Sequence, residues 1–258
     1  MILFVFEGSD DSKIMDTLKK AYPSAISEDV VCLYRNNIYQ LYKKMNSSDF
    51  TESILSVLQT HLKGDELLKI RGANEDSFSQ VFLFFDYEPQ HRESDAVDIE
   101  ILNARLCEMI DFFSDETGNG KLYVSYPMVE ALFYTKKLPD NNFKDYVCPL
   151  LDAKQFKKTA SEFSDYKSHD FLLYSERELQ GEKLLRTVVR DNWRMVVDQN
   201  LVKANVICTG NESIPLQKMS VSQQSIFENQ MEKYVGNGHV AILSAYPLFL
   251  FEYLNLEK

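Results

Sequence analysis

Short runs of consecutive apolar residues recur through the first half of the chain. Runs of this length with few polar interruptions predict strands that are buried on both faces, as in a parallel sheet covered by helices. The runs are Ile2–Phe6, Val30–Tyr34, Val81–Phe85 and Leu122–Ser125.

Segments with helical apolar spacing separate these predicted strands. They cover residues 14–21, 38–44, 50–62 and 99–113. A further helix is expected to begin in Tyr126–Leu132, because Pro127 suits a first helical turn, where the missing N–H has no partner to lose. Strands that alternate with helices in this way predict an α/β fold with a mostly parallel, doubly wound sheet.

The second half of the chain has a different pattern. Long amphipathic helices are expected at Ala153–Phe163, Glu176–Asn200 and Gln223–Tyr234, followed by a late strand at 240–244 and an apolar helix. We therefore predict an α/β domain over residues 1–140. Residues 141–258 are predicted to be a mainly helical extension packed on it, with Trp193 in the contact.

The charge of the chain limits its partners. There are 28 Lys and Arg against 39 Asp and Glu, a net charge of −11, and the sequence pI is about 4.9. A simple basic nucleic-acid binder has a high pI, and a polybasic membrane-surface protein is disfavoured on the same ground. Nucleic acid then requires a local basic patch, a metal ion or a basic partner.

The cysteines and the apolar segments indicate where in the cell the protein is expected. The four cysteines form no CxxC pair, so neither a zinc cluster nor a disulfide framework is expected. The N-terminus lacks the basic region of a signal peptide, and the longest uncharged apolar stretch, 240–251, is too short for a membrane span. We expect a cytoplasmic protein that does not engage the membrane.

Carboxylates follow three of the predicted strands. Glu7 follows the first strand, Asp86 and Glu88 follow the third, and Glu130 lies just beyond the fourth. Ligands of open α/β sheets bind beyond the carboxyl ends of the strands, and crowded carboxylates need protons or a hard cation such as Mg²⁺ or Mn²⁺. Taken singly, each acid could equally be a turn or helix-cap residue.

The order of these motifs resembles a TOPRIM domain over about residues 1–135. The counterparts are Glu7-Gly8 after a strand, Asp86-Tyr87-Glu88 after a later strand, and Pro127-Met128-Val129-Glu130 after another. The chain looks closest to the RloB/AriB-like and OLD-type nucleases of prokaryotic antiphage defence. Asp-x-Glu stands here where the family usually has Asp-x-Asp, and Asp10-Asp11-Ser12 replaces the Thr-Glu of the first RloB-like motif.

The resemblance implies a TOPRIM-like sheet and a metal-dependent nuclease that cleaves RNA or DNA as a toxic effector in antiphage defence. It implies that Glu7 and Glu130 are catalytic, that Asp86, Glu88 and Glu130 bind Mg²⁺ or Mn²⁺, and that Lys203 is a transition-state cation. The alternative is a non-catalytic TOPRIM-like interaction module that docks a partner ATPase or sensor, or assembles with itself.

Several basic residues are candidates for contacts with nucleic acid. Arg186, Arg190 and Arg194 recur every four residues, which places them on one helix face as a possible phosphate-contacting stripe. The alternative is a solvated face beside Asp191 and Asp198. His91, five residues after Asp86, is either a general acid or phosphate contact, or an ordinary surface histidine.

Overall fold

The sheet predicted for the first half is present. A computed structural model describes residues 1–22, 26, 29–91, 98–172 and 182–254. Its five-stranded sheet has the order β2-β1-β3-β5-β4, and every pairing is parallel except β4 with β5. The strands are β1 (Ile2–Phe6), β2 (Asp29–Leu33), β3 (Gln80–Asp86), β4 (Ser114–Asp115) and β5 (Gly120–Ser125). The four predicted strands are confirmed, and only the short edge strand β4 was not expected.

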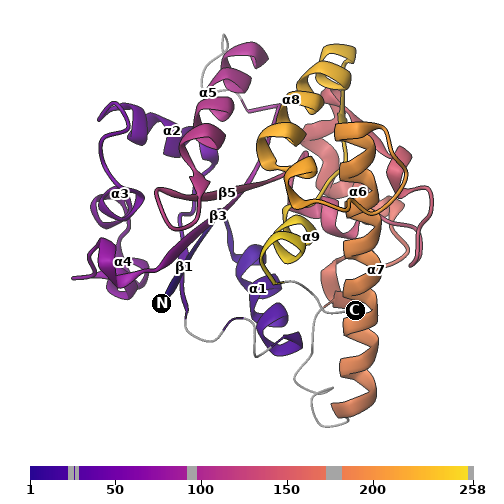
Figure 1. The fold of residues 1–258 in the computed structure, drawn as a ribbon, viewed down its shortest axis with the longest axis horizontal. Helices are drawn as coiled ribbons and strands as arrows, with labels where there is room; N and C mark the ends of the chain where they lie inside the picture. The colour runs from indigo at the N-terminus through magenta and orange to yellow at the C-terminus, as the bar shows by residue number, and fades with distance from the viewer. Residues whose placement is uncertain (23–25, 27–28, 92–97, 173–181, 255–258) are drawn as a thin grey trace.

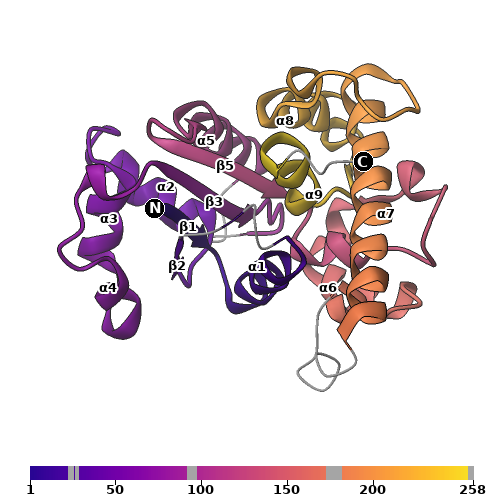
Figure 2. The same cartoon turned by 60° about the horizontal axis from the view of Figure 1, so that its bottom comes forward.

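Helices cover both faces of the sheet, as Figure 2 shows for α1 and α5. On one face, α5 (Ile99–Phe112) contacts β5 and α2 (Ile38–Asn46). On the other face lie α1 (Ser9–Ala21) and α9 (Ala245–Phe249). Phe249 packs edge-on against Phe84, with the ring centroids 5.4 Å apart, so a helix near the end of the chain completes the core of the N-terminal sheet.

Two of the helices begin at other residues in the structure than the sequence predicts. The expected stretch 50–62 begins only at α3 (Ile54–His61), because Phe50 has a φ of 55°, which an α-helix does not accommodate. Ser53 caps α3 by accepting a hydrogen bond from the Ser56 N–H. The helix expected from Pro127 is a 3-10 helix, η2 (Val129–Phe133), and Pro127 precedes it after a cis peptide bond.

The longest helix, α7 (Glu182–Thr209), runs nine residues beyond its predicted end at Asn200, because Leu201, Ala204 and Ile207 continue the buried face. Gly210 ends it with a φ of 79°, a conformation that glycine adopts readily. Residues 176–181 of the predicted helix lie outside the described residues. Trp193 is fully buried, as expected, and its indole N–H donates to the Leu172 carbonyl over 3.2 Å.

The rest of the second half is largely helical. It contains α6 (Phe156–Phe163), α8 (Gln223–Lys233) and several 3-10 turns, among them η3 (Phe143–Asp145), η4 (Leu150–Gln155) and η5 (His169–Leu172). The late strand β7 (His239–Ala241) pairs antiparallel with β6 (Val147–Pro149). The helix α4 (Gly64–Ile70), in the first half, was not expected. Figure 1 shows α7 and α6 beside the sheet, on the side away from α3 and α4.

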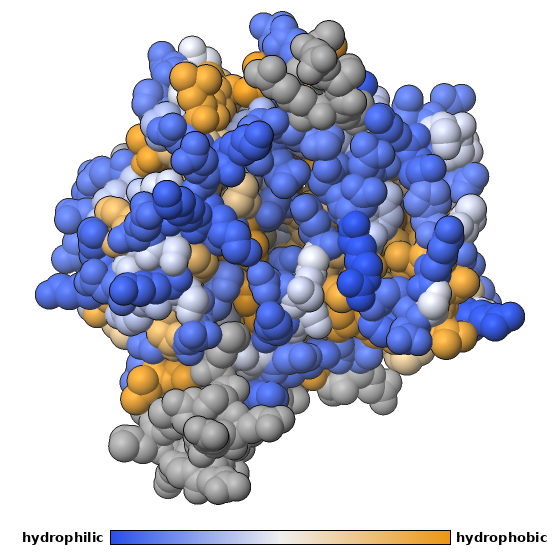
Figure 3. Space-filling view, turned by 180° about the vertical axis from the view of Figure 1, so that it is seen from behind, coloured by the Kyte–Doolittle hydropathy of each residue, from blue (hydrophilic) through white to orange (hydrophobic). Residues whose placement is uncertain are grey.

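The surface is mainly hydrophilic. The face opposite to that of Figure 1 carries hydrophobic residues only in scattered groups (Figure 3). Within the described ranges, no helix combines the length and apolarity that a bilayer crossing requires.

Candidate active site at the carboxyl edge of the sheet

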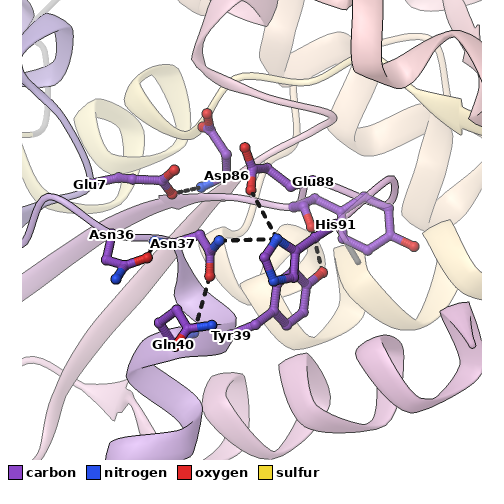
Figure 4. A network of polar contacts seen from close by, with 9 residues as sticks. Glu7, Asn36, Asn37, Tyr39, Gln40, Asp86, Glu88 and His91 are labelled. Atoms are coloured by element: carbon purple, nitrogen blue, oxygen red, sulfur yellow. Dashed lines mark hydrogen bonds and ion pairs between the residues drawn. The ribbon is translucent and has the colours of Figure 1, made fainter. Parts of the chain in front are cut away.

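Two neighbouring parallel strands bring Glu7 and Asp86 together. Glu7 follows β1, and Asp86 is the last residue of β3. The Glu7 N–H donates to the Phe84 carbonyl over 3.1 Å, and its carboxylate Oε2 accepts from the Asp86 N–H, also over 3.1 Å. This last bond appears in Figure 4, where the Glu7 carboxylate lies beside the Asp86 backbone. The two acids are therefore adjacent at the carboxyl edge, as the sequence predicts.

Glu88 joins this edge by a turn of the backbone. The Tyr87 N–H donates to the Ser125 carbonyl and the Glu88 N–H to the Pro127 carbonyl, over 3.0 and 3.1 Å. Glu88 has a φ of 42°, so regular strand backbone ends before this residue. Left-handed backbone is uncommon for a residue other than glycine, and such positions concentrate at functional sites.

Glu130 approaches from η2, where it is buried. One of its carboxylate oxygens lies 3.0 Å from the Lys157 Nζ, which reaches it from the exposed surface of α6. The same Nζ is 3.6 Å from Asp10. Burial, and then the negative charge of Glu130, raise the pKa of Glu88, so Glu130 belongs to the same electrostatic cluster.

Asp11 is a fifth acid at this site, and sequence reasoning did not select it. Its carboxylate accepts hydrogen bonds from the Gly8 N–H over 3.2 Å and from the Tyr246 hydroxyl over 2.9 Å. Burial raises the pKa of Asp11 to about 7 despite these bonds. Its place three residues after Gly8, at the start of a helix, is the sequence signal that could have identified it. The Tyr246 contact spans 235 residues and has no local signal.

The carboxylates are held in an environment that disfavours their charged forms. Burial, and then the charge of Glu88, raise the pKa of Glu7 to about 8. Burial and the neighbouring charge of Glu7 raise the pKa of Asp86 well above its usual range. Across the described parts of the chain, no lysine or arginine forms an ion pair with Glu7, Asp11 or Asp86. The site therefore needs protons or an added cation to balance its charge.

The donors at this edge are carboxylate oxygens, the type that Mg²⁺ and Mn²⁺ prefer. As the side chains stand, no three His, Cys, Asp or Glu among the described residues are placed to hold a metal ion together. The set fits a hard cation in its chemistry, and the carboxylates would have to turn toward one point to bind it.

His91 lies beside the acids. Its Nδ1 is 4.0 Å from a Glu88 carboxylate oxygen and 3.1 Å from the Asn37 amide nitrogen, and its ring stacks on Tyr39 with centroids 5.2 Å apart. These contacts are drawn in Figure 4. The structure brings His91 to the site, packed in place rather than free on the surface.

Lys203 is not brought to the acids. It is fully buried in α7, and its Nζ donates to the carbonyls of Lys144 and Tyr146 over 2.6 and 2.8 Å. Burial lowers its pKa to about 7. Because its ammonium group is engaged with these carbonyls, Lys203 is a structural residue in this conformation, contrary to the role that the resemblance implied.

The predicted arginine stripe also lies away from the acids. The Arg190 Nε donates to the carbonyl of Ala21, the last residue of α1. Since α1 starts at the carboxyl edge and is about 20 Å long, Ala21 lies toward the opposite edge of the sheet. Arg194 is exposed on the same helix, and the side chain of Arg186 lies outside the described residues.

Comparisons with protein-family models, with curated proteins and with solved structures found no match to this chain. The chemistry of the site has to be argued from its own residues.

Proposed function

We propose that the carboxyl edge of the sheet is the active site of a metal-dependent nuclease of the TOPRIM type. The observation that carries the proposal is the juxtaposition of Glu7 and Asp86, joined by a 3.1 Å hydrogen bond, with no lysine or arginine among the described residues paired to either acid. The approach of Glu88 and Glu130 to the same edge of a mostly parallel sheet supports the proposal. The TOPRIM resemblance extends the proposal to a toxic effector in antiphage defence.

The proposed metal ligands are Asp86, Glu88 and Glu130. A Mg²⁺ or Mn²⁺ ion held by these carboxylates would neutralise charge on the scissile phosphate and lower the pKa of a bound water. Such ions usually complete their coordination with substrate phosphates and water, so binding in the absence of substrate is expected to be weak.

Glu7 is the proposed general acid or base. With a pKa of about 8, its carboxyl group exchanges a proton near neutral pH, which is the property that acid–base catalysis requires. The Asp86 N–H occupies Oε2, so Oε1 is the oxygen on which this proton is carried. The raised pKa would fall on arrival of a cation, so the same oxygen could accept a proton from an attacking water.

The alternative is a TOPRIM-like module that binds partners without cleaving. It is favoured by the absence, among the described residues, of a ready three-ligand metal set, and by the Asp-x-Glu motif. In that case the carboxylates are a docking surface for an ATPase, a sensor or a second copy of the chain, and their removal affects assembly without affecting any cleavage.

The deciding experiment is a cleavage assay on labelled RNA and DNA, single- and double-stranded, with Mg²⁺, Mn²⁺ or EDTA. We expect cleavage that depends on the divalent ion and falls at least about 100-fold in Glu7→Gln and in Asp86→Asn. Glu232→Gln, an exposed acid on α8, is the matched control and should cleave like the wild type. No cleavage by the wild type, or full cleavage by Asp86→Asn, would remove the nuclease proposal.

A further inference from the structure

A large pocket adjoins the acidic site on its α6 side. Its volume is about 950 Å³, and its walls come from α1, η2, η4, α6 and residues 167–170. Glu130 and Asp10 line it, so it begins where the carboxylate cluster ends. A volume of this order accommodates a small molecule or a single nucleotide.

The rim of the pocket is rich in lysine, although the chain as a whole is acidic. The five lysines are Lys13, Lys154, Lys157, Lys158 and Lys167. Lys13 pairs with Asp10 at 3.0 Å and Lys158 with Glu162 at 3.7 Å, both on exposed surface, where such pairs are weak and readily exchanged. Among the described residues, Lys154 and Lys167 form no ion pair. Their ammonium groups are available to an anionic ligand.

The floor of the pocket is apolar and aromatic. Buried Ile14 and Phe133 line it, and the His169 ring stands edge-on to Phe133 with centroids 4.7 Å apart. The His169 Nε2 is buried and has no hydrogen-bond partner within the described residues. An apolar and aromatic floor beneath a cationic rim matches the two parts of a nucleotide, its base and its phosphate.

Lys157 links the pocket to the acids. Its Nζ lies 3.0 Å from Glu130 and 3.6 Å from Asp10, although its side chain is 71 % exposed. A phosphate chain that runs from the pocket to the carboxyl edge passes this ammonium group first. The pocket is thus placed to hold the unit next to the one that reaches Glu7 and Asp86.

We propose that this lysine pocket receives one unpaired nucleotide of a single-stranded nucleic acid, with its phosphate at the lysines and its base on Phe133 and His169. The inference rests on the proposed function, because it assigns the substrate class of the same site. A base that is paired within a duplex cannot enter such a pocket unless it is first extruded.

The test is a binding measurement that needs no cleavage. Fluorescence anisotropy with a labelled single-stranded oligonucleotide in EDTA is compared for the wild type and for the double variant Lys154→Ala/Lys158→Ala. The matched control is Lys44→Ala/Lys63→Ala, at an exposed lysine in α2 and another that directly precedes α4. Figure 1 shows both helices on the side of the sheet away from α6. We expect the pocket variant to bind the oligonucleotide at least fivefold more weakly than the wild type. The control variant should bind it as tightly as the wild type. The slope of log K against log salt should be smaller by about 1.4, for two lost phosphate contacts at about 0.7 each.

A second variant tests the base contact. His169→Ala should weaken binding of the normal oligonucleotide and leave unchanged the binding of an abasic strand of equal length.

The inference is overturned if the wild type binds no strand, if the pocket variant binds as tightly as the wild type, or if a blunt duplex binds as well as the single strand. If the wild type cleaves with metal and the pocket variant cleaves equally well, only the proposal for the pocket is refuted. If binding depends on the pocket but no cleavage occurs, only the proposal of nuclease activity is refuted.

Discussion

Two regions of the molecule bury charged side chains, and they do so in different ways. In the helical half, Lys203 is enclosed with two carbonyl acceptors for its ammonium group. At the carboxyl edge, Glu7 accepts one backbone N–H, and burial and neighbouring acids raise its pKa to about 8. A buried polar group with its hydrogen bonds made supports the fold, whereas clustered like charges without a counter-ion oppose it. The difference separates a structural residue from a candidate functional site, although Lys203 is buried, Glu7 is half-buried, and both have shifted pKa values.

The first prediction tests the structural side of this contrast. Lys203→Ala removes the donor to the Lys144 carbonyl and one of two donors to the Tyr146 carbonyl, which keeps the Ile242 N–H, and it leaves a cavity beside α7. The free energy of unfolding should therefore fall by about 3 kcal/mol. Urea denaturation measures this change. Lys137→Ala, at an exposed lysine, is the control and should change stability by less than about 0.5 kcal/mol. A well-folded Lys203→Ala protein that loses only cleavage would restore Lys203 as a catalytic candidate.

The second prediction concerns pH and divalent ions. The folded-state pKa values of Glu7 and Asp11, about 8 and 7, lie above the ordinary values of 4.5 and 3.8. The folded state therefore binds more protons than the unfolded state, and without metal its stability should fall as the pH rises from about 4.5 through 8. A bound cation replaces these protons. A Mn²⁺ concentration of 100 times the Kd at pH 8.5 should thus add about 2.7 kcal/mol at that pH. The same concentration should add much less at pH 6, where protons compete for the carboxylates and raise the Kd.

Thermal or urea unfolding at matched ionic strength checks this prediction. The double variant Glu7→Gln/Asp86→Asn is the control, because it removes the contribution of Glu7 to the pH dependence and, if these acids bind the ion, the cation effect; the contribution of Asp11 remains. An equal Mn²⁺ effect in the variant would place the ion elsewhere on the protein.

The third prediction tests the unfavourable charge at the edge directly. Asp86→Asn keeps the shape of the side chain and removes a half-buried carboxylate that Glu7 and Asp11 repel. At pH 8 and without metal, it should raise the free energy of unfolding by about 1 kcal/mol while it abolishes cleavage. Early melting of Asp86→Asn would instead show that its carboxylate has a structural partner.

Much of this fold and part of this site could be predicted from the sequence. Uninterrupted apolar runs such as Val81–Phe85 predicted the strands, and the rule that ligands bind at carboxyl edges grouped Glu7 with Asp86. The left-handed backbone at Glu88 and the cis bond before Pro127 were not predicted, because they depend on contacts made after the strands pair. Lys203 was misassigned because its carbonyl partners in η3 and just beyond it are nearly sixty residues away in the chain.

The pocket beside Glu130 could not be predicted from the sequence either. Lys13 and Lys157 belong to α1 and α6, which are separated by more than half of the chain, so no local pattern joins them. Asp11 is an intermediate case, since its helix position has a local signal and its Tyr246 partner has none. Local patterns thus located the elements and the acids, and long-range packing decided which charged groups share a site.

The last prediction distinguishes the contribution of the Glu88 backbone conformation from that of its carboxylate. Its φ of 42° is strained for any residue with a Cβ, and glycine tolerates it. Glu88→Ala and Glu88→Gly both remove the carboxylate, so both should lose metal-dependent cleavage to the same extent. Glu88→Gly should nevertheless be the more stable of the two, by about 1 kcal/mol in urea denaturation, because the gain from relieved strain exceeds the entropy cost of glycine. Cleavage retained in Glu88→Gly and lost in Glu88→Ala would show that the left-handed turn, and not the carboxylate, is what the site requires of this position.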